Sequence, residues 1–226
     1  VPHALLLVRV GLAQAAHVGG HLPDELPVDA RHGDGRVLVD RHVDALNEPH
    51  RPIPSGRIPG RWGLYIAIAW SLLSLSVATM LGPVVTGATI IGLILAWAYS
   101  APPVRLKKNG WWGNAACGFS YEGLSWVTGA AIMTGGAWPE PRTIVLAMLY
   151  SLGAHGIMTL NDFKSIDGDT RTGIGSLPVR LGAEKAGLVA CLFMTLAQIA
   201  VVACLVIWGL LWPAAVVGAL IAAQVV

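Results

Sequence analysis

Long apolar runs constrain what this chain can fold into more than any other feature. A helix needs about 20 mostly apolar residues to cross a lipid bilayer. Five segments reach or nearly reach that length: 62–81, 83–99, 114–133, 142–160 and 186–209. A sixth apolar run covers 211–226, and only 12% of all residues are charged. The sequence therefore predicts an all-α, polytopic transmembrane helical bundle.

Basic residues are distributed unevenly over the loops between these segments. Because successive helices cross the membrane in opposite directions, loops 40–61, 100–113 and 161–185 share one side. That side carries nearly all of the loop Lys and Arg residues, whereas the other side carries only Arg142. The positive-inside rule predicts an integral, multi-pass protein whose charged loops are cytoplasmic. A net charge of +2 without a basic stripe indicates no nucleic-acid partner.

The first acidic cluster lies at the start of the basic side's first loop. Asp40 and Asp44 are four residues apart, so they share one face if the segment is helical. Carboxylate-lined sites suit Mg²⁺, whose remaining ligands are waters and substrate phosphates. The Pro-rich loop that follows carries Arg51 and Arg57. A guanidinium group binds two phosphate oxygens at once.

The second acidic cluster repeats this composition at the end of the apolar segment 142–160. Asp162 and Asp169 are seven residues apart, and Ser165 lies between them on the predicted shared face, whereas Asp167 points elsewhere. Positive charge lies close by, on Lys164 and Arg171, and Lys108 in the loop 100–113 could also touch a diphosphate. Two clusters that combine acidic and basic residues, both on one side of the membrane, predict a site that binds a metal ion and a diphosphate. The alternative for either cluster alone is an ordinary solvated loop.

Three stretches make the chain resemble the UbiA superfamily of intramembrane aromatic prenyltransferases, with its closest likeness to the chlorophyll and bacteriochlorophyll synthases. They read DRHVDALNEPHRPIPSGRIPGRWGLY (40–65), YSAPPVRLKKNGWWGNAACGFSYEGLSWVTGAAIM (99–133) and NDFKSIDGDTRTGIGSLPVRLG (161–182). The first and third are similar to the family's two aspartate motifs, and the second to its central loop and next helix. The resemblance covers about 40–226, and YEGLSWVTGAA favours the bacteriochlorophyll branch.

This resemblance implies an Mg²⁺-dependent enzyme of the last step of (bacterio)chlorophyll synthesis. It would transfer a geranylgeranyl or phytyl group from its diphosphate to the propionate of (bacterio)chlorophyllide. The implied catalytic residues are Asp40, Asp44 and Asp162, and these three with Asp169 are the implied metal ligands. The residues implied to bind the diphosphate are Arg51, Arg57, Lys108, Lys164 and Arg171.

Polar and aromatic residues within the apolar segments give an expected acceptor pocket of Tyr121, Glu122, Trp126 and His155. Intramembrane acids are energetically expensive and often functional. Glu122 is therefore expected to orient the acceptor, to pair with a loop Arg, or to be a neutral or hydrogen-bonded packing residue. Tyr121 and Trp126 either stack on a planar macrocycle or pack between helices. His155 is either an axial ligand of the chlorin magnesium or, as we favour, a core histidine.

The chain departs from the family pattern in two places. The family's first motif reads NDxxDxxxD, and Arg36 and Val37 stand at its leading Asn-Asp. Residues 1–39 contain no 20-residue apolar run. We expect this segment to be either a disordered arm or the product of a shifted reading frame. The expected prenyltransferase domain, 40–226, ends before the last of the nine helices that the resemblance implies.

Three alternatives remain at this stage. One is another prenyltransferase of the same superfamily, such as a quinone or haem enzyme, although the central-loop sequence argues against it. Another is a cation or metal carrier that uses the aspartates as a path. The last is a non-catalytic remnant that still binds pigment.

Overall fold

The computed structural model describes residues 50, 52–53, 55–58, 61–225 of the chain. The predicted segment 1–39 and the predicted site residues Asp40, Asp44 and Arg51 lie outside these residues. The expected boundary between an atypical segment and a helical domain at residue 40 therefore stays a prediction.

The described part of the chain is built almost wholly from helices. The long ones are α4 (Trp62–Leu81), α5 (Pro83–Ser100), α8 (Pro141–Asn161), α11 (Ala183–Ile207) and α12 (Leu211–Val225). Between α5 and α8, α6 (Gly110–Gly118), the π-helical turn η2 (Phe119–Leu124) and α7 (Ser125–Met133) follow one another directly. Four short elements complete the fold: η1 (Leu106–Lys108), η3 (Asp162–Ser165), α9 (Ile166–Thr172) and α10 (Leu177–Leu181). The predicted all-α class is confirmed.

Among the described residues, four helical segments are long and apolar enough to cross a bilayer. They are α4, α5, the α8 segment with its extension to Thr172, and α11. The predicted segment 114–133 differs from expectation, because the helix begins earlier, at Gly110, and contains the π turn. Its earlier start has a local cause, since the Asn109 side chain accepts a hydrogen bond from the Trp111 N–H at 3.0 Å and caps α6.

Glycine and proline set the helix ends where the chain reverses. Gly82, at a φ of 113°, joins α4 to α5, and Pro83 is the first residue of α5. A Cβ on Gly82 would lie 3.1 Å from the Cα of Gly136, so the turn before α5 touches the turn after α7. Gly182 (φ 79°) and Gly209 (φ 75°) bound α11, which therefore covers 183–207 rather than the predicted 186–209.

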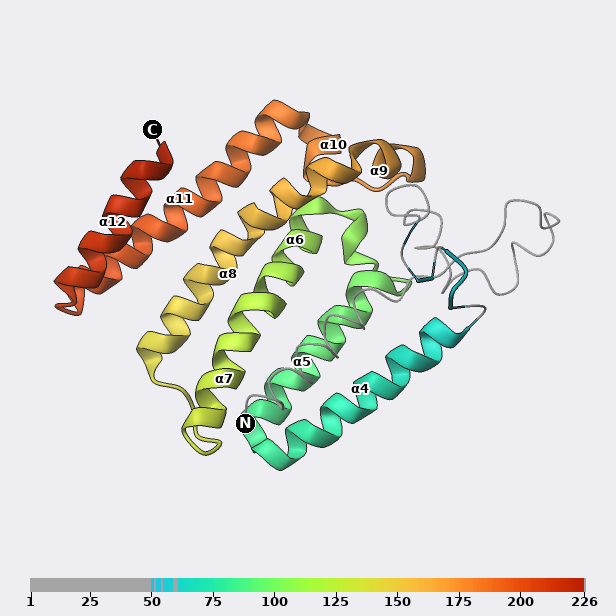
Figure 1. The fold of residues 1–226 in the computed structure, drawn as a ribbon, viewed down its shortest axis with the longest axis horizontal. Helices are drawn as coiled ribbons and strands as arrows, with labels where there is room; N and C mark the ends of the chain where they lie inside the picture. The colour runs from blue at the N-terminus through green and yellow to red at the C-terminus, as the bar shows by residue number, and fades with distance from the viewer. Residues whose placement is uncertain (1–49, 51, 54, 59–60, 226) are drawn as a thin grey trace.

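The long helices lie side by side in a layer, in the order α4, α5, α6–α7, α8, α11 and α12 (Figure 1). Most buried apolar residues are alanine, and glycine marks the closest crossings. A Cβ on Gly118 would lie 2.6 Å from the Ser151 carbonyl oxygen, and one on Gly156 would lie 2.5 Å from the Ala190 carbonyl oxygen. Small residues allow such close approach between helices in lipid, where hydrophobic burial gives little drive for association.

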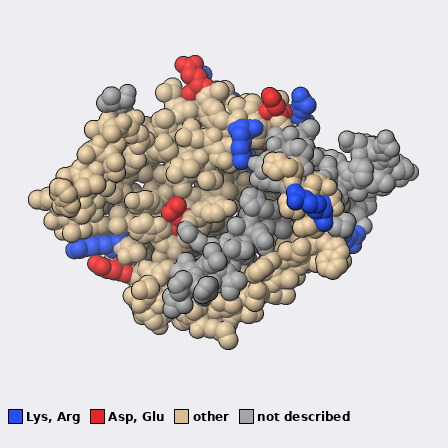
Figure 2. Space-filling view, in the orientation of Figure 1, with Lys and Arg blue, Asp and Glu red and all other residues tan. Residues whose placement is uncertain are grey.

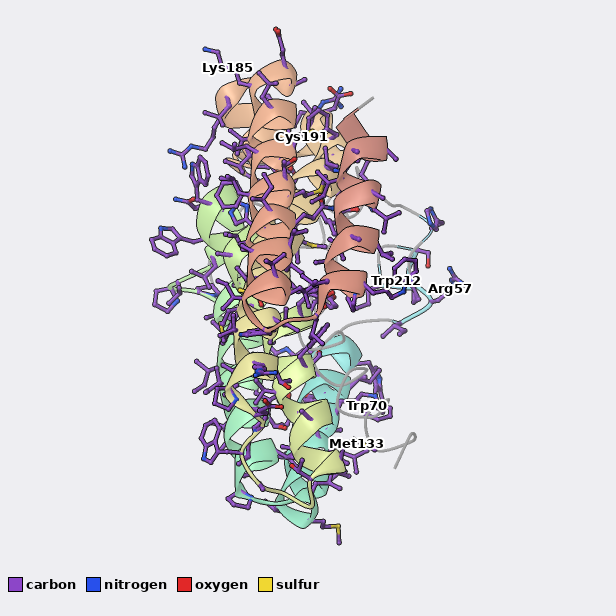
Figure 3. All side chains as sticks on the ribbon, turned by 90° about the vertical axis from the view of Figure 1, so that its left-hand side faces the viewer. Arg57, Trp70, Met133, Lys185, Cys191 and Trp212 are labelled. Atoms are coloured by element: carbon purple, nitrogen blue, oxygen red, sulfur yellow. The ribbon has the colours of Figure 1, made fainter. Side chains whose placement is uncertain are left out.

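The charged loops meet at one end of this layer, which we call the site end. There α6 begins, α8 ends, and α9 and α10 follow (Figure 1). Figure 3 shows Lys185, near the start of α11, far from Met133 at the end of α7. Loops 101–109 and 162–182 thus share one end, as the alternation of helices predicted.

A backbone clamp joins these two loops. The Gly110 N–H donates to the Gly175 carbonyl at 2.9 Å, and the Gly175 N–H donates to the Lys108 carbonyl at 3.1 Å. A Cβ on Gly110 would lie 2.5 Å from the backbone nitrogen of Leu177, which is buried. The second acidic loop is therefore held to the start of α6 by main-chain contact, and only glycine fits at residue 110.

We expect Gly110→Ala to lower the thermal unfolding temperature of the detergent-solubilised chain, because the added methyl group would overlap backbone rather than a flexible side chain. Overpacking of this kind costs about 1–3 kcal/mol. The matched control is Gly87→Ala in α5, where a Cβ meets nothing within 4 Å. Equal unfolding temperatures for the two variants would contradict the clamp.

Candidate active site

Asp162 stands at the point where α8 passes into η3, and Asn114 fixes its carboxylate. The Asn114 Nδ2 donates to Asp162 Oδ2 at 3.0 Å and to Thr159 Oγ1 at 3.2 Å. Thr159 in turn donates to the His155 carbonyl at 2.9 Å. Asn114 and Thr159 are both buried, so this network orients Asp162 from inside the helix layer.

Ser165 links the two aspartates of the second cluster. Its Oγ lies 3.0 Å from the Asp162 carbonyl oxygen and 3.0 Å from Asp169 Oδ2, so the hydroxyl hydrogen is shared between two acceptors. Asp169 is buried and Asp167 is exposed, in keeping with the predicted faces. The path between Asp162 and Asp169 differs from two regular α-helical turns, because residues 162–165 form a 3₁₀ turn before α9 begins.

The predicted diphosphate-binding residues lie at the site end or in the loop before α4. Lys108, Lys164 and Arg171 are exposed on η1, η3 and α9. Arg57 is exposed too, but its guanidinium donates to Ser55 Oγ at 3.0 Å and to the His50 carbonyl, within its own loop. Figure 2 shows charged side chains gathered mainly at the ends of the molecule, around a broad surface without Lys, Arg, Asp or Glu.

The oxygen donors at the second cluster fit a hard cation such as Mg²⁺. Asp162 and Asp169 each present a carboxylate of which one oxygen is engaged by Asn114 or Ser165. Within the described ranges no group of three or more His, Cys, Asp or Glu residues is placed to hold a metal. The structure thus brings together two of the four predicted ligands, while Asp40 and Asp44 lie outside its description.

A polar stripe runs from this cluster along α6 into the apolar layer. Asn114, Cys117 and Tyr121 follow at helical spacing, and the Cys117 thiol is hydrogen-bonded to Tyr99 of α5. Beyond them, Glu122 Oε2 accepts a hydrogen bond from the Trp126 indole at 3.1 Å. Three of the four predicted acceptor residues therefore lie on one helix, in and after the π turn.

His155 does not join this group. Its Nε2 lies 3.2 Å from the Trp111 carbonyl oxygen, and its ring stacks on Phe193 of α11 with centroids 4.5 Å apart. Trp111 packs beside the same ring at 5.8 Å, and His155 is only 5% exposed. The structure thus places His155 in a packed and buried position, as the favoured core-histidine alternative expects, and its place in the acceptor pocket stays a prediction.

A comparison with known families decides the assignment. The model of the UbiA prenyltransferase family matches residues 37–226. The chain belongs to the UbiA prenyltransferase family. The predicted resemblance over 40–226 is confirmed and extends three residues further toward the N-terminus.

Curated relatives and solved structures agree with this membership. The bacteriochlorophyll synthase 33 kDa chain of Cereibacter sphaeroides is 57% identical over 82% of this chain and 61% of its own length. The chlorophyll synthase of Arabidopsis thaliana is 40% identical over 83% of this chain and 49% of its own length. A UbiA homologue from Archaeoglobus fulgidus, bound to DMAPP and Mg²⁺, has the same fold, with a TM-score of 0.61 at 19% identity over 95% of this chain and 82% of the other. The chain thus spans about three fifths of the first of these relatives.

Sequence reasoning missed Asn114 and Tyr150 as site residues. Asn114 stands at the edge of a predicted apolar segment. An amide at that position in a membrane helix itself indicates a polar contact with another helix, because its N–H donors require partners. Tyr150 stacks on Trp126 with ring centroids 4.9 Å apart. Nothing in the sequence around Tyr150 indicates this contact, because it joins residues of two different helices.

We expect Asn114→Ala to weaken Mg²⁺ binding by about 10–100-fold, the range found when a hydrogen-bond partner of a metal ligand is removed. The reason is that Asp162 would lose the donor that fixes its carboxylate. Thermal stabilisation of the purified chain by increasing Mg²⁺ measures the effect, at fixed prenyl diphosphate concentration.

The control for this prediction is Thr134→Ala, which removes a hydroxyl bonded to the Ala130 carbonyl at the opposite end of the same helix. If Mg²⁺ stabilised the Asn114→Ala chain as strongly as it stabilises the control, metal binding at Asp162 would not depend on the hydrogen bond from Asn114.

Proposed function

We propose that this chain transfers a geranylgeranyl or phytyl group from its diphosphate to the propionate of chlorophyllide or bacteriochlorophyllide. The observation that carries the proposal is the 57% identity to a bacteriochlorophyll synthase chain, extending over 82% of this chain. The 41% and 40% identities to chlorophyll synthases of Avena sativa and Arabidopsis thaliana support the same acceptor class. The digeranylgeranylglyceryl phosphate synthase of Methanothermobacter thermautotrophicus, at 32%, is more distant.

The site end supplies the groups that this reaction requires. Breaking the allylic C–O bond of the donor leaves negative charge on the diphosphate, and fixed positive charge lowers the barrier to that step. Asp162 and Asp169, together with Asp40 and Asp44, would hold Mg²⁺, which when bound neutralises charge on the leaving group. Lys108, Lys164 and Arg171 would contact the remaining diphosphate oxygens. Because the acceptor carboxylic acid has a pKa of about 4, it is ionised at neutral pH and needs no strong base.

The position of these groups suits substrates that are charged at one end and apolar at the other. The carboxylates and basic side chains lie where α6 begins and α8 ends, whereas the helices between the two ends are apolar. A diphosphate head would bind at the site end while its isoprenoid tail lies along the apolar helices. The excess of basic residues in these loops supports a cytoplasmic site.

The positions of the described acidic residues fit a cation carrier less well than the proposed prenyltransferase. A conducting path needs polar groups near the middle of the membrane. Apart from Glu122, the acidic residues within the described ranges lie at helix ends or in turns: Glu140, Asp162, Asp167, Asp169 and Glu184. A pigment-binding chain without turnover is the remaining alternative, and the esterification assay separates it from an enzyme.

We expect membranes that contain this chain to form prenylated pigment when given Mg²⁺, geranylgeranyl or phytyl diphosphate, and chlorophyllide or bacteriochlorophyllide. Asp162→Ala and Asp44→Ala should each lower the rate at least about 100-fold, because each removes a carboxylate proposed to hold the metal. Solvent extraction followed by chromatography of the esterified pigment measures the rate.

The control is Glu184→Ala, which removes an exposed acid of α11 at the same end of the molecule. Pigment binding without ester formation in any donor and acceptor combination would favour the non-catalytic alternative. Near-parental rates in Asp162→Ala would remove the metal role from that residue.

A further inference from the structure

Glu122 is an acid within the apolar layer with a single hydrogen-bond partner. It lies in the π turn η2, and its Oε2 accepts from Trp126 Nε1 at 3.1 Å. Within the part of the chain that the structure describes, the Trp126 indole is the hydrogen-bond partner that the Glu122 carboxylate shows. Because an isolated carboxylate in lipid is energetically expensive, a partner for its second oxygen is expected.

An aromatic surface adjoins this carboxylate. The Trp126 indole, which donates to Glu122, stacks on Tyr150 of α8 with ring planes 29° apart. Tyr150 is 46% exposed, so the stack is open on one side. The π turn brings these groups together against α8, where a Cβ on Gly123 would lie 2.8 Å from Ser151 Oγ. Single π turns within α-helices occur frequently at functional sites.

Glu122 lies on the same helix as Asn114, eight residues further into the layer. At about 1.5 Å per residue, this places it about 12 Å along the helix from the residue that orients Asp162. Tyr121, the neighbour of Glu122, continues the stripe formed by Asn114 and Cys117. The carboxylate and the aromatic stack therefore follow the acidic cluster along one continuous helix.

We propose that Glu122 is the axial ligand of the central magnesium of the chlorin acceptor, with the Trp126–Tyr150 stack packed beside the macrocycle. This assignment rests on the proposed function. A chlorin magnesium has open axial positions, and magnesium prefers oxygen ligands such as carboxylate. The Trp126 hydrogen bond would hold the carboxylate in a fixed orientation and leave its other oxygen for the metal.

Two further observations support Glu122 over the alternatives. His155, the ligand considered from sequence, is buried between Trp111 and Phe193 and has no approach for a macrocycle. Coordination at Glu122 would also leave the pigment's propionate arm free to extend toward Asp162, where the donor's diphosphate is proposed to bind. Glu122 would thus select pigment that contains magnesium, and it would also set the position of the propionate that reacts.

The test is pigment binding by the purified full chain in detergent, without prenyl diphosphate, followed by the visible absorption bands that respond to axial coordination. The probes are magnesium bacteriochlorophyllide and its metal-free counterpart. We expect Glu122→Gln, which keeps an oxygen that can accept from Trp126, to weaken binding of the magnesium pigment at least about tenfold. Its affinity for the metal-free pigment should change little, and Glu122→His should restore an axially ligated spectrum.

Glu140→Gln, in an exposed turn before α8, is the matched control. Equal losses for the two pigments in Glu122→Gln, or no loss for either, would overturn the assignment. If the parent chain bound neither pigment, the proposed acceptor would fail together with this ligand. If binding of the magnesium pigment depended on Glu122 but no ester were formed, Glu122 would be supported as the axial ligand, and only the proposed transfer would be contradicted.

Discussion

The close contact of α6 and η2 with α8 sets the positions of most residues in the candidate site. In lipid, helices associate through packing and a few polar contacts, so the distance between two backbones depends on the side chains at their crossing. Gly118 and Gly123 bring the helix against Ser151, with no room for a Cβ at either position. That approach places Asn114 within hydrogen-bonding distance of Asp162 and Trp126 against Tyr150. One crossing therefore organises both the acidic cluster and the aromatic stack.

The second acidic loop depends on main-chain geometry as well as on its charges. Gly175 accepts a backbone hydrogen bond from Gly110 and donates one to the Lys108 carbonyl, which joins two loops that are far apart in sequence. Within the loop, the Ile174 N–H donates to the Asp169 carbonyl at 2.9 Å, and Gly173 ends α9 at a φ of 70°. These backbone contacts do not involve the carboxylate oxygens, so they do not require a bound cation. A loop held in this way reduces the cost of assembling the site when a ligand binds.

The sequence predicted those features that a bilayer or local spacing imposes. Bilayer thickness sets the helix lengths, so α4 was predicted with the bounds 62–81 that the structure has. Spacing placed Ser165 between Asp162 and Asp169. The sequence does not reveal the roles of Asn114 and Tyr150, because their contacts join residues on different helices. Asn114 contacts Asp162, 48 residues away, and Tyr150 contacts Trp126, 24 residues away.

The π turn explains how one helix serves two chemically different ends of the site. A π turn takes up one more residue than an α-helical turn, so every later side chain is shifted by one position, about 100° around the axis. In a regular α-helix with this sequence, the Asn114–Cys117–Tyr121 stripe and the Glu122–Trp126 pair would have a different angular relation. Gly118 and Gly123 lie immediately before and within the turn, so the close packing against α8 continues through it. The irregular turn therefore changes the direction in which the intramembrane carboxylate and its aromatic partner lie relative to the acidic cluster, while the close packing against α8 is kept.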